Sequence, residues 1–243
     1  MALVAVSVAS FLALGQSDAQ SPIIADLSSH LIAVTTGFTG AELLLFGAIE
    51  QKGDIVLVVR GPNTPVTVRR KSRIAGVWLN DASVVFEGVP AFYALAASEG
   101  FAERASPGLL RRLQFGLDNL RAESPGVTVP AAKPFRAALV RRRQAEALFP
   151  TAIEPVSVLA DRLFRTTVRF PSNVPTGTYL VEVFFVVDDD VVSAQTTPLS
   201  VSRLGLGAEI FAFAHEQSAI YGFVAVAMAM AAGWAAGFIF RRG

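Results

Sequence analysis

The chain has 243 residues, no cysteine and a formal net charge of +1 at neutral pH. The missing cysteine excludes disulfides, thiolate metal ligands and cysteine nucleophiles together, and the small net charge argues against a nucleic-acid partner. Hydrophobic residues make up 52% of the sequence, and the mean hydropathy of +0.49 is high for a soluble protein, partly because of two terminal apolar segments.

An apolar run over residues 2–14 opens the chain and is too short to span a bilayer comfortably. Small residues follow it, with Ser17 and Ala19 at the third-last and last positions before a cleavage after Ala19. This layout predicts a secretory signal peptide over residues 1–19, and hence export of the chain behind it. Because no Lys or Arg precedes the apolar run, we expect the native start codon to lie upstream.

Short runs rich in Val, Ile, Leu and Thr fill residues 20–100, and clusters of Gly, Pro, Asn and Asp separate them. The candidate strands are Leu31–Thr36, Ala41–Ile49, Ile55–Arg60, Val66–Arg70, Ile74–Leu79 and Ser83–Phe86. Regularly spaced short strands with turn residues between them predict a mainly β fold. An antiparallel sandwich of the immunoglobulin-like type fits this pattern best.

The spacing of apolar residues changes to three or four over residues 101–150, which predicts helices. One helical face is formed by Leu109, Leu110, Leu113, Leu117 and Leu120. Ser106 followed by Pro107 is typical of a helix start. A second helix is predicted over Pro134–Leu148, so we expect a helical pair inserted between two β regions.

Strand patterns resume over residues 151–203, at Leu163–Phe170, Thr178–Val187 and Val191–Val201. Thr176-Gly177 precedes a pair of strands here, much as Thr39-Gly40 does in the first β region. Two related β modules would produce this repetition, and so would two halves of one sandwich. The sequence leaves both alternatives open.

Residues 218–240 form an apolar segment without a formal charge, which a juxtamembrane stretch over residues 204–217 connects to the β region. A helix of that length would cover the hydrocarbon core of a bilayer. Arg241 and Arg242 in the tail 241–243 predict a cytoplasmic C-terminus, because Lys and Arg are retained on that side. The interpretation is one C-terminal transmembrane α-helix in the inner membrane, with the bulk of the chain in the periplasm.

Small residues recur every fourth position within this segment, at Ala225, Ala229, Gly233 and Gly237. Small side chains on one face let a neighbouring helix approach closely, and close packing drives helix association in lipid. The spacing therefore predicts contact with another transmembrane helix. That helix would belong to a second copy of the chain or to a polytopic permease.

Basic residues form three clusters that could contact an anionic ligand, an acidic lipid headgroup or an acidic partner. They are Arg69, Arg70, Lys71 and Arg73 in the first β region, Arg111 and Arg112 in the first predicted helix, and Arg141, Arg142 and Arg143 in the second. A solvated helix face accounts for the last two clusters equally well. Lipid binding also has a geometric condition, since the basic residues must lie toward the membrane.

Catalytic and metal-binding patterns are lacking in the sequence. Its two histidines, His30 and His215, have no further histidine at ligand spacing, and no Gly-x-Ser-x-Gly elbow is present. Trp78 is interpreted as a core or turn residue. We therefore expect no catalytic residue, no metal and no cofactor, and an interaction protein rather than an enzyme.

Several local motifs, in this order along the chain, are similar to those of one family. They are Gly37–Ala41 with Leu45–Ala48, Val59–Pro62, Gly76–Asn80, Val89–Ala94 and Pro175–Tyr179. Through them the chain resembles the alphaproteobacterial putative transmembrane protein family over nearly its whole mature length. The resemblance implies a signal peptide, a single C-terminal span and no known site residues.

Members of that family are often encoded beside a permease of the sulfite-exporter type, so the resemblance also implies a possible partner. We expect a membrane-anchored periplasmic accessory protein that associates with an inner-membrane complex. The alternative is a periplasmic binding module that captures an anionic ligand, such as a sulfur oxyanion or an envelope polymer, through the arginine clusters.

Overall fold

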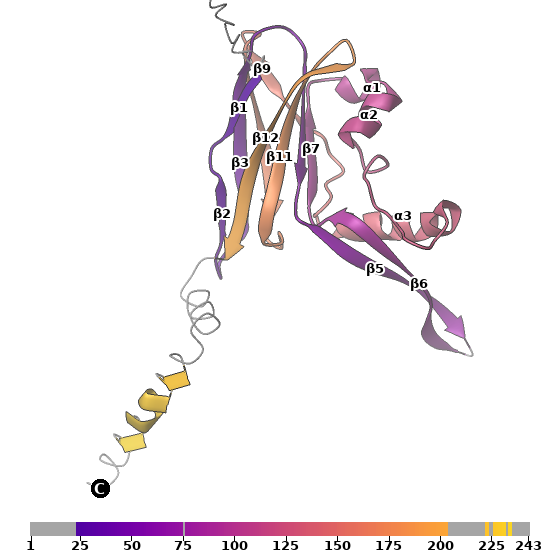
Figure 1. The fold of residues 1–243 in the computed structure, drawn as a ribbon, viewed down its shortest axis with the longest axis vertical. Coiled ribbons are helices and arrows are strands. Elements are labelled where there is room, and N and C mark those ends of the chain that lie inside the picture. Colours follow the sequence, from indigo (N-terminus) through magenta and orange to yellow (C-terminus); the bar gives the residue numbers. More distant parts are fainter. Residues whose placement is uncertain (1–22, 75, 204–221, 224–225, 232, 235–243) are drawn as a thin grey trace, which may run out of the picture.

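The computed structural model of the chain describes residues 23–203, except residue 75, and residues 222–234, except 224, 225 and 232. Two β-sheets form the body, and a long two-stranded arm and three helices lie on one side of it (Figure 1). Most of the long strands of the body have an apolar face, and β4 (Asp54–Arg60) is apolar on both faces. Stacking two sheets buries these faces together, which accounts for the layered architecture.

The first sheet, named sheet A, has four strands in the order β1-β3-β10-β9. Their bounds are Ile23–Leu27 for β1, Gly40–Ile49 for β3, Ser157–Leu159 for β9 and Leu163–Pro171 for β10. Side chains alternate between the two faces of a strand, so Leu43 and Leu45 are buried whereas Leu44 and Phe46 are exposed. Sheet A thus has one buried face and one face toward solvent.

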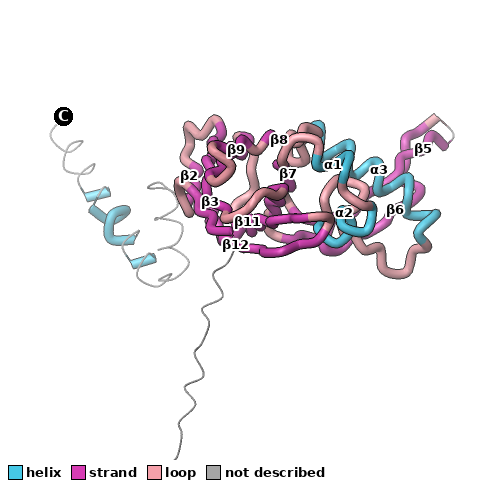
Figure 2. Tube along the Cα trace, turned by 90° about the horizontal axis from the view of Figure 1, so that it is seen from above, coloured by secondary structure: helices cyan, strands magenta, loops and turns pink. Residues whose placement is uncertain are grey.

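The second sheet, named sheet B, has six strands in the order β2-β12-β11-β4-β7-β8. Their bounds are Leu31–Val34 for β2, Asp54–Arg60 for β4, Tyr93–Ala97 for β7, Glu154–Pro155 for β8, Gly177–Val187 for β11 and Asp190–Arg203 for β12. Ile55 to Val59 in β4 form an unbroken apolar run and are all fully buried. Such a run needs cover on both faces of the sheet. Sheet A covers one face, and the helices lie over the other (Figures 1 and 2).

The strand order is that of an immunoglobulin sandwich. Strands β1, β3, β10 and β9 occupy the places of its ABED sheet, and β12, β11 and β4 those of its GFC sheet. Tyr179, near the start of β11, donates its hydroxyl proton to the Pro175 carbonyl oxygen at 2.6 Å. This hydrogen bond is the tyrosine corner of such sandwiches. Without cysteines to bridge the sheets, the core at this point is the aromatic cluster of Phe92, Phe170 and Tyr179.

The two β regions on either side of the helices belong to one sandwich. Strand β3 pairs antiparallel with β10 in sheet A, and β4 pairs antiparallel with β11 in sheet B. Each sheet therefore mixes strands from residues 20–100 with strands from residues 151–203. The similarity between Thr39-Gly40 and Thr176-Gly177 reflects two halves of one sandwich, not two separate modules.

The β5–β6 arm is a hairpin inserted between β4 and β7, with β5 at Asn63–Ile74 and β6 at Val77–Pro90. It leaves the body at one end and projects away from it (Figure 1). The sequence pattern predicts three short strands here, but residues Val66 to Phe86 form two long paired strands with one turn that contains Gly76. The interruption near Asp81 is a register shift within β6, not a turn.

The helical insertion comprises α1 (Phe101–Arg104), α2 (Pro107–Leu113) and α3 (Val129–Ala145). The Ser106 side chain accepts a hydrogen bond from the Leu109 amide at 3.1 Å, so the predicted start of the first long helix is confirmed. That helix ends at Gln114, whose φ of 52° is left-handed, and does not continue to Leu120. The second predicted helix begins earlier than expected, with Pro134 inside it.

The predicted C-terminal transmembrane helix over residues 218–240 is wrong for this structure, because no helix among the described residues is long and apolar enough to cross a membrane. Described helical residues in this segment are 222–223, 226–231 and 233–234. The prediction rested on hydropathy, which measures preference for lipid and not whether a backbone forms one continuous helix. Four residues of the predicted packing face and cytoplasmic anchor lie outside the described part of the chain, namely Ala225, Gly237, Arg241 and Arg242. The predicted signal peptide lies outside it as well.

Candidate functional site

The structure brings parts of two of the basic clusters together where the β5–β6 arm meets α3. Arg69 of β5 and Arg142 and Arg143 of α3 line one cleft of about 440 Å³. The floor of this cleft is apolar, because Val66 and Val68 on the alternate positions of β5 pack toward Leu139 of α3. Arg141 is not among the lining residues.

One carboxylate offsets part of the positive charge in this cleft. Arg142 Nε lies 2.7 Å from Glu146 Oε1, and Arg143 Nη1 lies 3.8 Å from Glu146 Oε2. Arg143 is largely buried, whereas Arg142 is exposed. The cleft therefore keeps a net positive charge, with Arg69 as the basic side chain that Glu146 does not pair.

Arg70 has a structural partner on the opposite strand of the arm. Its guanidinium donates to Asp81 in a bidentate pair, with Nε–Oδ1 at 3.1 Å and Nη2–Oδ2 at 2.9 Å. The hydrogen bond from Arg70 holds the pKa of the Asp81 carboxyl below its usual range. This pair lies where the register of β6 shifts, so Arg70 serves to stabilise the arm.

The tip of the arm consists of Lys71 to Asn80 around the Gly76 turn, and it carries exposed apolar side chains. Trp78 is 65% exposed, and its neighbours Val77 and Leu79 are also exposed. The interpretation of Trp78 as a core residue is therefore wrong, because its side chain lies in solvent near the turn of the arm. Sequence reasoning missed the tip because it divided the arm into separate short strands, and a single long hairpin would have placed Trp78 beyond the reach of the body.

A second exposed apolar surface, named the apolar stripe, crosses the outer face of sheet A. Ile24 pairs with Ala48, Ala48 with Leu163, and Leu163 with Leu159, so these side chains lie in one row across the four strands. Ile24 is 69% exposed and Leu163 57% exposed. Phe46 and Leu44 extend the stripe along β3. The sequence of β3 contained a signal for the stripe, because its outward-facing residues Leu44, Phe46 and Ala48 are apolar like its inward-facing ones.

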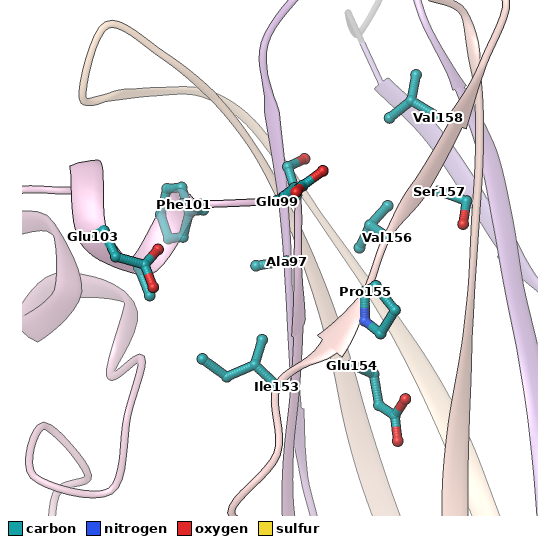
Figure 3. A pocket seen from close by; sticks show the side chains of 13 residues that line it. Ala97, Glu99, Phe101, Glu103, Ile153, Glu154, Pro155, Val156, Ser157 and Val158 are labelled. Carbon is teal, nitrogen blue, oxygen red and sulfur yellow. The ribbon is translucent and has the colours of Figure 1, made fainter.

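A cleft of about 570 Å³ lies between the end of β7, α1 and β8 (Figure 3). Its acidic residues are Glu99, Glu103 and Glu154, which are spread along the cleft and do not converge on one point (Figure 3). Glu154 is engaged by Arg169, whose Nη1 lies 2.6 Å from its Oε1. No group of three or more metal-ligating side chains occurs in the described ranges, so this cleft has no built metal centre there.

Buried polar groups connect the helical insertion to sheet B. Arg60 of β4 pairs with Glu182 of β11, and its Nη2 donates to the Leu113 carbonyl oxygen at the end of α2 at 2.8 Å. The Tyr93 hydroxyl donates to the Gln114 carbonyl oxygen at 2.5 Å and accepts from the Gly116 amide at 3.0 Å. Burial raises the pKa of Tyr93, so its hydroxyl stays neutral. These groups hold the fold together, and Arg60 and Gln114 also line a cleft of about 440 Å³ beside the base of the β5–β6 arm.

A family model with the description "Putative transmembrane protein (Alph_Pro_TM)" matches residues 22–242. The chain belongs to this family. The match confirms the family resemblance of the local motifs and covers the sandwich, the arm and the helices together. This description supports association of the chain with a membrane. No curated protein and no solved structure matches the chain.

Proposed function

We propose that this Alph_Pro_TM protein is an accessory protein that stands on the periplasmic side of the inner membrane and assembles with a membrane-protein complex. The family description supports the membrane location. The signal-peptide-like start of the sequence supports export of the body. The observation that carries the interaction function is the apolar stripe on sheet A.

The apolar stripe has the anatomy of a protein-binding surface. Contiguous apolar surface is uncommon on the outside of a protein that acts alone. The stripe places Ile24, Ala48, Leu163 and Leu159 in one row across four neighbouring strands. Charged side chains flank it. Arg169 Nε lies 3.1 Å from Glu42 Oε1 on one side, and Arg165 is exposed beside Phe46 in the register. An apolar centre with a charged rim is typical of a docking surface.

Photo-crosslinking in native membranes tests this function. A benzoylphenylalanine replacing Leu163 or Phe46 should form an adduct with one inner-membrane protein. The matched control is the same residue at Val192, which is equally apolar and exposed on β12 of sheet B. A permease of the sulfite-exporter type is the first partner to look for. Adducts only with a second copy of this chain, or the same adducts from Val192, would contradict the proposal.

Co-purification of the partner with the full chain, after a charged residue is introduced into the apolar stripe, is an independent test. The substitution Leu163→Arg should remove the partner while the protein stays folded, because the side chain is exposed and only the stripe loses its apolar character. Val192→Arg should leave the partner bound. Recovery of the partner with both variants would refute a role for the stripe.

The second candidate function is capture of an anionic ligand, and the basic cleft between the arm and α3 favours it. Arg69, Arg142 and Arg143 line the cleft from two elements, and guanidinium groups bind oxyanions through charge-assisted hydrogen bonds. Calorimetric titration of the full chain with sulfite and sulfate should then show binding that Arg69→Gln weakens and Arg141→Gln, outside the cleft, does not. No heat of binding at low salt would exclude this alternative.

A further inference from the structure

We propose that the tip of the β5–β6 arm is a membrane-docking element that binds the surface of an anionic phospholipid bilayer. In this inference Val77, Trp78 and Leu79 enter the interface between headgroups and acyl chains. Lys71 and Arg73 of the tip, and Arg69 just before it in β5, contact the phosphate groups. It deepens the proposed function, since it rests on the location of the body beside a membrane and adds how the body is oriented there.

The apolar residues at the tip have no role in the core of the protein. Val77, Trp78 and Leu79 are all exposed, and none belongs to the core cluster that Val84 and Phe86 join at the base of the same strand. A two-stranded hairpin gains no stability from apolar side chains that face water. Exposed apolar side chains at the far end of the arm therefore indicate a site of contact with another molecule or with a membrane.

The distribution of apolar side chains between the two faces of the tip distinguishes a lipid from a protein groove. Residues that pair across antiparallel strands share a face, so Trp78 lies on the face of Arg73, and Leu79 on the face of Ser72. Trp78 and Leu79 are neighbours in β6 and hence point to opposite faces. A protein groove would cover one face, whereas a hairpin that enters the headgroup layer edge-on contacts lipid with both.

The charge of the tip complements an anionic surface. Residues 69–80 contain four basic side chains, Arg69, Arg70, Lys71 and Arg73, and no acidic one. The first acidic residue after them is Asp81. Asp81 is neutralised by Arg70, and among the described residues none of Arg69, Lys71 and Arg73 forms an ion pair. Three positive charges thus remain in and next to the tip, which also carries an exposed tryptophan, a side chain that favours membrane interfaces.

The direction of the arm satisfies the geometric condition for lipid contact. Strand β12 ends at Arg203 at the end of the body from which the arm also leaves, and the tip lies beyond that end (Figure 1). Figure 2 shows that the arm reaches outward on the side of the body opposite β2. A membrane that faces this end would meet the tip of the arm and would lie on the same side of the body as the end of β12 (Figure 1).

Fluorescence of Trp78 tests the inference directly, because the chain has only two tryptophans. In a Trp234→Phe variant of the full chain, Trp78 is the only indole. This variant is reconstituted into vesicles of phosphatidylcholine alone or mixed with phosphatidylglycerol, with brominated lipids as quenchers. We expect a blue-shifted emission that brominated lipid quenches in the anionic vesicles, and a water-exposed emission in neutral vesicles or at high salt.

Charge variants separate surface binding from other causes. In the anionic vesicles, Arg69→Glu, Lys71→Glu and Arg73→Glu together should abolish lipid quenching, since each basic side chain contributes about fivefold to the affinity for such a surface. The control replaces three exposed arginines outside the arm, Arg111, Arg121 and Arg162, by glutamate, and should keep the quenching. Water-exposed emission in every lipid would overturn the inference. A blue shift without lipid quenching would also overturn it, because the tip would then contact a protein or a second copy.

The outcomes for the tip and for the proposed accessory function are distinguishable. Trp78 reports on the arm, whereas adducts from Leu163 report on sheet A. Loss of lipid quenching with unchanged adducts would refute only the inference about the arm. Unchanged quenching without adducts would refute only the partner.

Discussion

The ion pair between Arg60 and Glu182 offers the sharpest test of how the helical insertion is held on the sandwich. Glu182→Gln keeps the size and shape of the side chain but removes the negative charge. Arg60 would then remain with its Nη2 bonded to the Leu113 carbonyl oxygen and without a counter-charge. Its Nε is already buried without a hydrogen-bond partner, so no second acceptor compensates.

The expected loss of stability follows from the burial of the pair. Removing one partner of a fully buried pair costs about 3–5 kcal/mol, because the other charge stays desolvated and unpaired. The side chains of Arg60 and Glu182 are 19% and 20% exposed, so water relieves part of this cost. We expect about 2–3 kcal/mol, which lowers Tm by about 4–12 °C in a domain of this size.

Thermal unfolding of the full chain in detergent, followed by near-ultraviolet circular dichroism, measures this shift. The matched control is Asp81→Asn, which removes the counter-charge of the exposed Arg70 and should lower Tm much less. The double variant Arg60→Met with Glu182→Leu should recover most of the stability, because no unpaired charge remains. A Tm for Glu182→Gln no lower than that of Asp81→Asn would refute the reasoning.

Two further predictions concern a close packing contact and an acid-sensitive hydrogen bond. Gly47→Ala should lower the free energy of unfolding in urea by about 1–3 kcal/mol, because a Cβ there would overlap the Ile24 carbonyl oxygen, whereas Gly37→Ala, with open space around it, should have almost no effect. Hydrogen bonds from Ser106 hold the pKa of Asp189 below its usual range, so this carboxylate stabilises the fold above its unfolded pKa and the contribution is lost as the pH falls through its folded pKa. The drop in Tm between about pH 6 and about pH 3 should therefore be smaller in Asp189→Asn, and an equal drop would contradict this account.

The β-rich character of the body could be predicted from the sequence because strand signals are local. Alternating apolar residues in β10 and an unbroken apolar run in β4 each define a strand without knowledge of its neighbours. The pairing could not be predicted, because β3 meets β10 across more than a hundred residues and no local pattern encodes that choice. Helix ends were predicted only where a side chain caps them, as at Ser106.

The surfaces that carry the proposals depend on long-range placement, which the sequence alone does not supply. The basic residues were recognisable as clusters, but whether Arg69 faces solvent, Asp81 or α3 depends on the register of the arm. The apolar stripe was less visible still. Ile24, Phe46 and Leu163 come from three strands, and they become one surface only after β1, β3 and β10 pair.

The helical insertion acquires a mechanical role from its position beside the arm. A two-stranded hairpin is marginally stable by itself and would not hold a fixed direction. Backbone hydrogen bonds between Glu87 and Glu123, at 2.8 and 3.0 Å, join the base of β6 to the segment before α3, and α3 packs along β5. Arg60 and Tyr93 fix the end of α2 to sheet B. The insertion thus braces the arm against the body on the side of the sandwich where the arm begins (Figure 1).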